Sequence, residues 1–293
     1  MADPLPIAYL NGEFLPLREA RVSPLDRAFL YGDAVYEVMP VYAGRVFRFT
    51  EHFDRLDRSL REIQMEPVYE RARWAQVCQE LVKRNGAGDM YIYVQVTRGA
   101  EFGRNHAPLP RIERTVFCFA APPVVPAPEK LERGVQAVTA ADNRWARCDV
   151  KSTALLANVL LKQLAVDAGA HETIMLRDGM LREGSSTTVH VVIGGEIRTP
   201  PRSQQILPGT TRDVVGQLAA RAGIPFRECE ISEAELRSAE EVFIGAATFG
   251  TLAITTLDGK PVGTGAPGPV WKRVRALFED YKRELAGKPI EES

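Results

Sequence analysis

The sequence predicts a two-domain protein of the α+β or α/β class, on the strength of three observations. Its 293 residues correspond to about two domains, since one domain typically has about 150 residues. Short helix-like and strand-like segments alternate along both halves of the chain. Four prolines within seven positions interrupt the middle of the chain and favour extended backbone there. We therefore expect a small α/β domain over 1–121, an ordered linker over 122–128 and a larger α/β domain over 129–293.

The first half is expected to contain two helices followed by two strands. Apolar residues recur at helical spacing from Phe53 to Ile63, and Thr50 is the expected N-cap of this helix. A second helix includes Trp74 and should stop at Asn85-Gly86. The segments 91–97 and 116–120 are predicted strands, because they are rich in β-branched and aromatic residues.

The second half is expected to alternate strands and helices down to the C-terminus. An apolar helix is predicted over 155–164 and is closed by Gly169. Asp178-Gly179 between two apolar segments predicts a β-hairpin. A helix over 213–222 should end at Gly223, a buried strand should cover 242–245, and a terminal helix should cover 270–285.

Composition and charge argue against several classes of protein. Apolar residues make up 45% and charged residues 26% of the chain, and the mean hydropathy is −0.16. The 37 basic and 38 acidic residues leave a net charge of −1, so nucleic-acid binding is not expected. No apolar run reaches 18 residues, and the first ten residues do not resemble a signal peptide. The four cysteines form no C-x-x-C pair. We expect a soluble, reduced, cytoplasmic protein without a membrane segment.

The motifs that the chain lacks narrow its chemistry. It contains no phosphate-binding G-x-x-x-x-G-K-[ST], no G-x-G-x-x-G, no G-x-S-x-G and no H-E-x-x-H. With four histidines in all, a multi-histidine metal site is not expected. ATP-type phosphate sites, dinucleotide sites and zinc hydrolase sites are therefore disfavoured, and we expect no metal.

One segment offers a candidate anion site. Pro208-Gly209-Thr210-Thr211 opens the predicted helix, and Thr210 with Asp213 has the spacing of a capping box. The backbone N–H groups at a helix start can also bind a phosphate, which Gly209 would allow to approach closely. From these residues alone a plain helix start and an anion site are equally acceptable.

Four other positions have a structural interpretation beside a functional one. Lys151 precedes the apolar helix, where burial beside Val150, Leu155 and Leu156 would lower its pKa and free the amine as a nucleophile; otherwise it is a solvated lysine. Glu183 precedes a strand in a polar turn, and Tyr36 lies in a strand. Arg104 and His106 share a loop, in which they are either solvated or bind a carboxylate.

Taken together, these segments resemble the class IV aminotransferases, the fold-type-IV enzymes that use pyridoxal 5′-phosphate (PLP). They occur in the family's order, and the match is best to the D-amino acid (D-alanine) aminotransferase branch. The segments that carry the resemblance are YGDAVYEV (31–38), FTEHFDRL (49–56), VQVTRG (94–99), RWARCDVKS (144–152), REGSSTTV (182–189) and ILPGTTRDVV (206–215). The resemblance implies the fold-type-IV architecture, with PLP bound between the two domains.

The resemblance also implies a role for each matched residue. Lys151 corresponds to the lysine that forms the Schiff base and shuttles the α-proton, and Glu183 to the carboxylate on the pyridine nitrogen. Arg55 and the helix start at Thr210-Thr211 correspond to the phosphate site. The further cofactor contacts that it implies are Ser186, Thr187, Leu207 and Thr248.

The substrate side of the site follows the D-amino acid branch. Tyr36, Arg104 and His106 match its carboxylate trap, in which the arginine and histidine come from the neighbouring subunit, so a homodimer is implied. The chain departs from the family at Ala246 and Ala247, where hydroxyl residues are frequent, and at Ala28, which replaces a glycine. It also has Thr188 and His190 where this branch usually has Asn and Phe.

The function that the resemblance implies is ping-pong transamination. A D-amino acid such as D-alanine would donate its amino group through Lys151 chemistry, and a 2-oxo acid such as 2-oxoglutarate would accept it. Two alternatives lie in the same family, a branched-chain L-amino acid aminotransferase and an aminodeoxychorismate lyase. A third is a non-catalytic PLP-binding protein.

Overall fold

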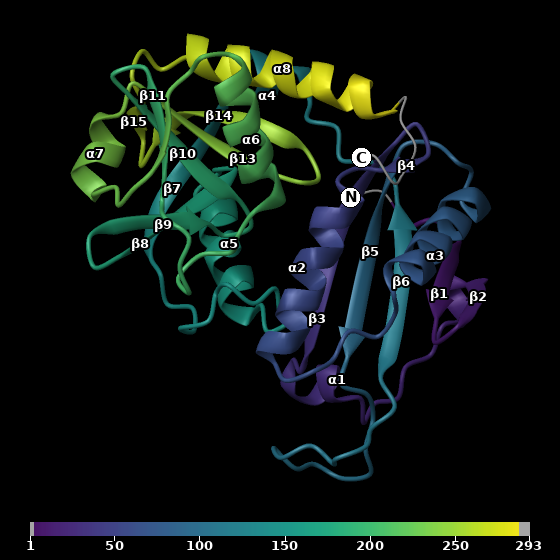
Figure 1. Ribbon diagram of the computed structural model, residues 1–293. Coiled ribbons are helices and arrows are strands. Elements are labelled where there is room, and N and C mark those ends of the chain that lie inside the picture. Colours follow the sequence, from purple (N-terminus) through teal and green to yellow (C-terminus); the bar gives the residue numbers. More distant parts are fainter. Residues whose placement is uncertain (1–2, 287–293) are drawn as a thin grey trace. The chain divides into compact units, whose positions relative to one another are not determined.

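The structure is a computed structural model that describes residues 3–286, and the chain divides into two compact units (Figure 1). Within that range the first unit comprises 3–124, 150–154 and 282–286, and the second comprises 125–149 and 155–281. Residues 150–154, expected in the C-terminal domain, are thus part of the first unit. None of the helices in the described range has the length and hydropathy of a membrane span.

The first unit is built on a six-stranded antiparallel sheet in the order β2-β1-β6-β5-β3-β4. Its strands are β1 (Ile7–Leu10), β2 (Glu13–Pro16), β3 (Ala34–Tyr42), β4 (Arg45–Val46), β5 (Met90–Thr97) and β6 (Thr115–Ala121). Its helices are η1 (Leu17–Glu19), α1 (Arg27–Tyr31), α2 (Phe49–Glu62) and α3 (Arg71–Arg84).

Helices α2 and α3 supply the apolar side chains that cover this sheet (Figure 1). Phe53 of α2 stacks on Trp74 of α3 at 4.9 Å between ring centroids, and both side chains are fully buried. Alternate residues of β5, such as Ile92 and Val94, join this core, because successive strand side chains point to opposite faces. Tyr93, between them, points to the other face.

The second unit is built on a nine-stranded mixed sheet. Its strands are β7 (Val135–Ala141), β8 (Glu172–Arg177), β9 (Met180–Gly184), β10 (Thr188–Ile193), β11 (Glu196–Thr199), β12 (Phe226–Glu228), β13 (Glu241–Ala246), β14 (Gly250–Leu257) and β15 (Lys260–Pro261). The helices of the remaining chain are α4 (Pro128–Arg133), α5 (Leu156–Asp167), α6 (Thr210–Arg221), α7 (Glu233–Ser238) and α8 (Pro269–Ala286).

Chain connectivity requires this sheet to curl. The strand order is β12-β11-β10-β13-β14-β7-β8-β9, so β9 and β10 are five places apart, or about 24 Å in a flat sheet. Only residues 185–187 connect them, and the four Cα–Cα steps reach about 15 Å. The curl therefore brings the end of β9, which carries Glu183, close to the start of β10.

Most of the predicted elements are confirmed with shifted ends. Strand β5 contains the predicted 91–97, and α3 ends at its C-cap Asn85. Asp178 and Gly179 have φ of 54° and 73°, the two positive values of a type I′ hairpin turn. Helix α6 ends before Gly223, whose φ is 65°.

Both predicted N-caps are wrong. The N-cap of α2 is Arg48, with φ of 55°, and Thr50 lies inside the helix because the chain enters it two residues earlier, with Arg48 O accepting from His52 N. The N-cap of α6 is Gly209, which accepts from Asp213 N through its own carbonyl. Thr210 is therefore the first helical residue, one position too late to cap Asp213 in a capping box.

Helix α5 exists as predicted, but much of its apolar stripe is not buried by the described residues. Leu156, Val159 and Leu160 are 72%, 60% and 56% exposed, and only Leu161 and Ala165 of this helix are buried. Leu156, one of the residues expected to surround Lys151, is thus mostly exposed. Helical spacing reveals a stripe but not what the stripe contacts.

Candidate active site

The segment that carries Lys151 runs along the edge of strand β3. Tyr36 N donates to Lys151 O at 3.0 Å, and Thr153 N donates to Ala34 O at 3.0 Å. Lys151 N in turn donates to Ser59 Oγ of α2 at 3.3 Å. These backbone bonds explain why 150–154 belong to the first unit, and they fix the direction of the Lys151 side chain.

Lys151 and Tyr36 lie together, as the site prediction requires. The Lys151 Nζ is 4.2 Å from the centroid of the Tyr36 ring, which is within the range of a cation–π contact. The Tyr36 ring itself is held by stacking on Tyr93, with centroids 5.6 Å apart. The amine is therefore held over a fixed aromatic surface.

Arg55 is held by a buried carboxylate on the neighbouring strand. Its Nε and Nη2 donate to Glu37 Oε1 and Oε2 at 2.6 and 2.8 Å, and His52 Nδ1 is 2.7 Å from Glu37 Oε2. Burial would raise the pKa of Glu37, but the Arg55 charge and these hydrogen bonds hold that pKa below its ordinary value. Glu37 is therefore anionic and fixes the plane of the Arg55 guanidinium.

His52 is the neutral member of this cluster. Burial lowers the pKa of His52 below its ordinary value, although the hydrogen bond to Glu37 opposes the shift. Because a carboxylate can only accept, the hydrogen between them belongs to Nδ1 of the neutral imidazole.

Glu183 at the end of β9 forms a second buried charge cluster. Its carboxylate pairs with Arg144 Nη1 and accepts from Leu207 N at 3.2 and 3.1 Å. Arg144 is in turn fixed by Asp142, which accepts from its Nε and Nη2 at 2.9 and 3.0 Å. Burial raises the pKa of Glu183, and the Arg144 charge only partly opposes that shift.

The Glu183 cluster suits a carboxylate that has to bind a further positive N–H group. The carboxyl group is 94% buried and oriented by two protein donors, so its position is fixed before any ligand arrives. Its raised pKa gives it a greater affinity for a proton or a cationic N–H than an exposed glutamate has.

The turn after Glu183 uses its hydroxyls within the protein. Ser185 Oγ and Thr187 Oγ1 both donate to the buried Glu172, the latter at 2.9 Å, whereas Ser186 is exposed. The Thr187 side chain therefore supports the turn. Because the Thr187 hydroxyl donates its hydrogen to Glu172, that hydrogen is not directed at a ligand.

The start of α6 retains the features of an anion site. Thr210 and Thr211 are its first two residues, both are buried, and no side chain caps the helix. The N–H groups in the first turn of a helix favour a phosphate. Packing also favours glycine at position 209, because a Cβ there would lie 2.6 Å from Thr188 Oγ1. Thr248 lies half-buried in the turn between β13 and β14.

Arg104 and His106 come together, but away from the other substrate-side residue. Both are exposed in the loop between β5 and β6, which extends beyond the strand ends (Figure 1). Arg104 Cζ is 5.1 Å and the His106 ring 5.5 Å from the centroid of the Tyr31 ring. Neither side chain has a hydrogen bond or ring contact to Tyr36 within the described chain.

The sequence reasoning missed Glu37, His52 and Arg144, although all three lie in the segments that carry the resemblance. Glu37 had a readable signal: it alternates with Val35 and Met39 on the buried face of a strand, where a lone carboxylate requires a partner. Arg144 had none, because its partner Glu183 is 39 residues away.

Comparison with known proteins places this geometry in a family. Residues 34–257 match the family model for amino-transferase class IV. The chain is 38% identical over 274 residues to a D-alanine aminotransferase of Staphylococcus haemolyticus, covering 93% of this chain and 96% of the relative. The chain belongs to the class IV aminotransferases.

Solved structures of this family have the same fold. A branched-chain amino acid aminotransferase of Escherichia coli superimposes with a TM-score of 0.87 at 28% identity, over 96% of this chain and 94% of the other. One from Thermoproteus uzoniensis, with norvaline, gives a TM-score of 0.83 at 27% identity, over 97% of this chain and 96% of the other. A further one, with pyridoxamine 5′-phosphate, gives 0.87 at 27% identity over 95% of both chains. The predicted α/β fold-type-IV architecture is confirmed.

Class IV aminotransferases use PLP, and the residues present here fit it. Lys151 offers a primary amine to an aldehyde, and Glu183 a buried carboxylate to a ring nitrogen. Arg55 and the α6 start offer positive charge and N–H groups to a phosphate. Each of these groups is fixed by a bond or by backbone within its own unit.

Proposed function

We propose that this class IV aminotransferase transfers the amino group of D-amino acids such as D-alanine to a 2-oxo acid such as 2-oxoglutarate, by a ping-pong mechanism. The observation that carries the D-amino acid assignment is the pairing of Arg104 and His106 on the Tyr31 ring. A guanidinium beside an imidazole binds a carboxylate group through several donors at once. The 38% identity to a D-alanine aminotransferase supports the same assignment.

These residues would act on one PLP, which when bound supplies an electron sink and carries the amino group. Lys151 Nζ would hold the cofactor and would move the proton at the substrate Cα. Glu183 would hold a hydrogen on the ring nitrogen, with Arg144 fixing the carboxylate. Leu207 would pack on the ring.

The phosphate would be bound by charge and by backbone donors. Arg55, held flat by Glu37, supplies the charge, and the first N–H groups of α6 at Thr210 and Thr211 supply donors. Because the Thr187 hydroxyl is bonded to Glu172, we assign its role and that of the exposed Ser186 to the backbone of the turn. Thr248 would add a hydroxyl from the β13–β14 turn.

The substrate carboxylate would be bound by Arg104, His106 and the Tyr36 hydroxyl. Arg104 and His106 have no contact to Tyr36 within the described chain, so we propose that they serve the site of a second copy in a homodimer. The exposed apolar stripe of α5, which includes Leu156, Val159 and Leu160, supports such an assembly.

A branched-chain L-amino acid aminotransferase is the second candidate. It is favoured by the solved structures with that activity, which superimpose with TM-scores up to 0.87 at 27–28% identity. The two candidates differ in the enantiomer that reacts, and hence in where the substrate carboxylate has to lie.

The deciding experiment follows the visible spectrum of the purified holoenzyme after a single amino donor is added. D-alanine is expected to convert the PLP band to the pyridoxamine form, whereas L-leucine is expected to leave it unchanged. Arg104→Ala should lower kcat/KM for D-alanine about 10- to 100-fold, the worth of a charge-assisted bond, and leave the PLP band intact.

Arg111→Ala is the matched control, since Arg111 is exposed in the same loop. Equal kinetics for the two variants, or conversion by L-leucine in place of D-alanine, would reject the D-amino acid assignment and favour the second candidate. Retention of wild-type transamination by Lys151→Ala would reject the catalytic site itself.

A further inference from the structure

We propose that Arg27 is a positioning residue, which fixes the loop that presents Arg104 and His106 to the substrate carboxylate. The inference rests on the function proposed above, because it concerns the same carboxylate-binding pair. Arg27 is the first residue of α1 and is 97% buried, although its side chain is charged. Burial of a guanidinium is costly unless its donors are satisfied.

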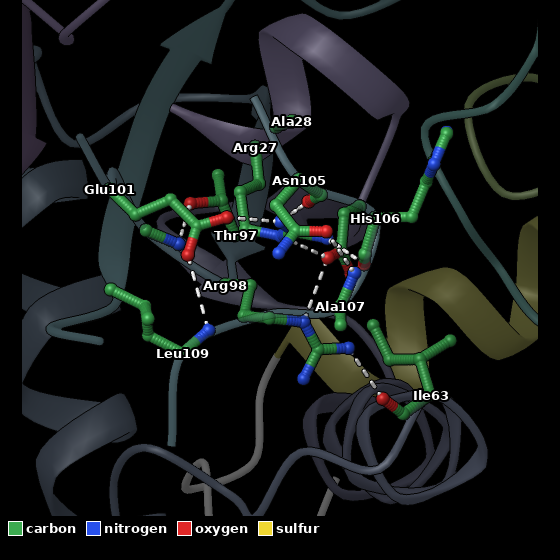
Figure 2. A network of polar contacts seen from close by, with 12 residues as sticks. Arg27, Ala28, Ile63, Thr97, Arg98, Glu101, Asn105, His106, Ala107 and Leu109 are labelled. Carbon is green, nitrogen blue, oxygen red and sulfur yellow. Dashed lines mark hydrogen bonds and ion pairs between the residues drawn. The ribbon is translucent and has the colours of Figure 1, made fainter. Parts of the chain in front are cut away.

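Arg27 directs its Nη1 and Nη2 donors at the loop, as Figure 2 shows. Its Nη1 pairs with Glu101 and donates to Asn105 O at 2.7 Å, and its Nη2 donates to His106 O at 2.8 Å. Its Nε donates to Asp33 Oδ2 at 2.8 Å. One planar group thus fixes two consecutive carbonyls of the loop.

Those two carbonyls belong to the two peptide units that flank the Cα of His106, and Asn105 follows Arg104 directly in the chain. Fixing both carbonyls therefore sets the direction in which the His106 side chain leaves the backbone, and it restrains the backbone next to Arg104. The loop tip has little else to hold it, since residues 102–110 are exposed and Phe102 is fully so.

Glu101 closes the loop at its base. Its Oε1 pairs with Arg27, and its Oε2 accepts from Leu109 N at 3.1 Å, so residues 101 and 109 are joined across the loop (Figure 2). Glu101 and Arg27 therefore form one clamp. The Glu101 carboxylate binds the base of the loop, and the Arg27 guanidinium binds its tip.

Tyr31 extends the clamp to the side chains. Arg27 and Tyr31 are one helical turn apart, and Arg27 Cζ is 4.6 Å from the Tyr31 ring centroid. The same ring contacts Arg104 at 5.1 Å and His106 at 5.5 Å. Arg27 thus holds the loop backbone directly and supports the ring on which both side chains rest.

The charges around Arg27 keep it ionised. Burial would lower the pKa of Arg27, but the hydrogen bonds and charges of Asp33 and Glu101 outweigh it and raise that pKa. A lysine would keep the charge but not the arrangement, because an ammonium lacks the planar fork that reaches two carbonyls and two carboxylates together. Arg27→Lys therefore keeps the positive charge but removes the arrangement of donors that holds the loop.

The first measurement is amide hydrogen exchange of residues 102–110 in the holoenzyme without substrate. Arg27→Lys is expected to speed exchange there at least tenfold. Arg98→Lys is the matched control, since Arg98 donates to the same Asp33 at 2.7 Å and to Ile63 O at 2.7 Å but has no hydrogen bond to residues 102–110 in the described part of the chain (Figure 2). Equal exchange in both variants would overturn the proposal, whatever the substrate is.

The second measurement is steady-state and half-reaction kinetics. Arg27→Lys should raise KM for D-alanine about tenfold, with less change in kcat, and Arg27→Lys added to the double variant Arg104→Ala/His106→Ala should cause no further rise. The half-reaction of 2-aminobutane, an amine without a carboxylate, should be unaffected. If Arg27 had a merely structural role, Arg27→Lys would slow the half-reactions of both D-alanine and 2-aminobutane and would lower the melting temperature of the enzyme.

The two proposals fail in different ways. If Arg104→Ala raises KM for D-alanine and Arg27→Lys does not, the positioning role is rejected and the proposed function stands. If Arg104→Ala leaves KM for D-alanine unchanged, the proposed function is rejected, and the exchange data then show only that Arg27 orders the loop.

Discussion

His190 is a fully buried histidine for which neither ring nitrogen has a hydrogen-bond partner among the described residues. Its ring stacks on Phe243, with centroids 4.8 Å apart and an angle of 19° between the planes. Burial, together with the nearby charge of Arg212, lowers the pKa of His190 to about 3. The position, usually Phe in the D-amino acid branch, thus behaves as an aromatic core position.

His190→Phe is expected to remove part of the acid sensitivity of the fold. Because the folded-state pKa lies below the ordinary 6.5, the unfolded chain takes up the proton first as the pH falls. Stability from neutral His190 is therefore complete above about pH 6.5 and declines toward pH 3, with a slope of up to about 1.4 kcal/mol per pH unit. Urea unfolding at several pH values should show a shallower decline in the variant.

Parallel stability curves for wild type and His190→Phe would contradict this prediction. The comparison has to be made as a difference, because burial also lowers the pKa of His52 and His171 and both contribute slopes of their own.

At the scale of elements, one carboxylate joins strand β3 to helix α2. Glu37 is fully buried and is bonded to both Arg55 and His52, which lie one turn apart on α2. The helix therefore presents its arginine in one orientation only. The sequence identified Arg55 from a motif, but the residue that orients it lies 18 positions earlier on another element.

Glu37→Gln is expected to lower the free energy of unfolding by about 3 kcal/mol at pH 7, because it removes one charge of a buried ion pair, that of Glu37 with Arg55. The folded-state pKa of Glu37 is depressed, so the loss is complete above pH 4.5 and shrinks as the pH falls below that value. PLP should also dissociate more readily, which the visible band can follow.

Glu80→Gln is the control for this experiment, since Glu80 forms an exposed i,i+4 pair with Arg84 on α3. It is expected to leave the unfolding midpoint and the PLP band unchanged. A midpoint for Glu37→Gln equal to that of Glu80→Gln would show that the buried pair does not hold α2 to β3.

At the scale of the whole molecule, the apolar stripe of α5 is left exposed by residues 3–286 of the single chain. Val159, Leu160 and Leu164 are each about half exposed or more, on one face of the helix. Large exposed apolar patches of this kind are typical of interfaces between subunits. We accordingly expect the stripe to be buried in the proposed homodimer.

Leu160→Glu is expected to weaken the dimer at least about 100-fold, because it buries an unpaired charge in the interface of both copies. Sedimentation equilibrium measures the dissociation constant, and the monomer should retain its circular dichroism but lose turnover of D-alanine. Gln163→Glu on the same helix is the control, since Gln163 is exposed and polar already. Wild-type association of Leu160→Glu would place the interface elsewhere.

Local features of this protein were predictable because they depend on a few neighbouring residues. Asp178-Gly179 tolerates the positive φ of a hairpin turn, and Gly223 ends α6 for the same reason. The alternation in β5 and the helical spacing in α2 follow from the side-chain periods of strand and helix. The ordered series of segments was likewise enough to indicate the class IV aminotransferases, which the comparisons confirm.

Only the tertiary structure decided the partners of the buried charges and the environment of α5. Arg144 finds Glu183 across 39 residues and Arg27 finds Glu101 across 74, while the Lys151 segment joins the edge of β3. No local pattern selects such partners, since their stability comes from the burial of the whole core and from satisfying each charge within it. The sequence by itself determined which elements form, where the hairpin turn at Asp178-Gly179 lies and which family this is. Which charges meet, and which apolar face stays uncovered, depended on how the entire chain packs.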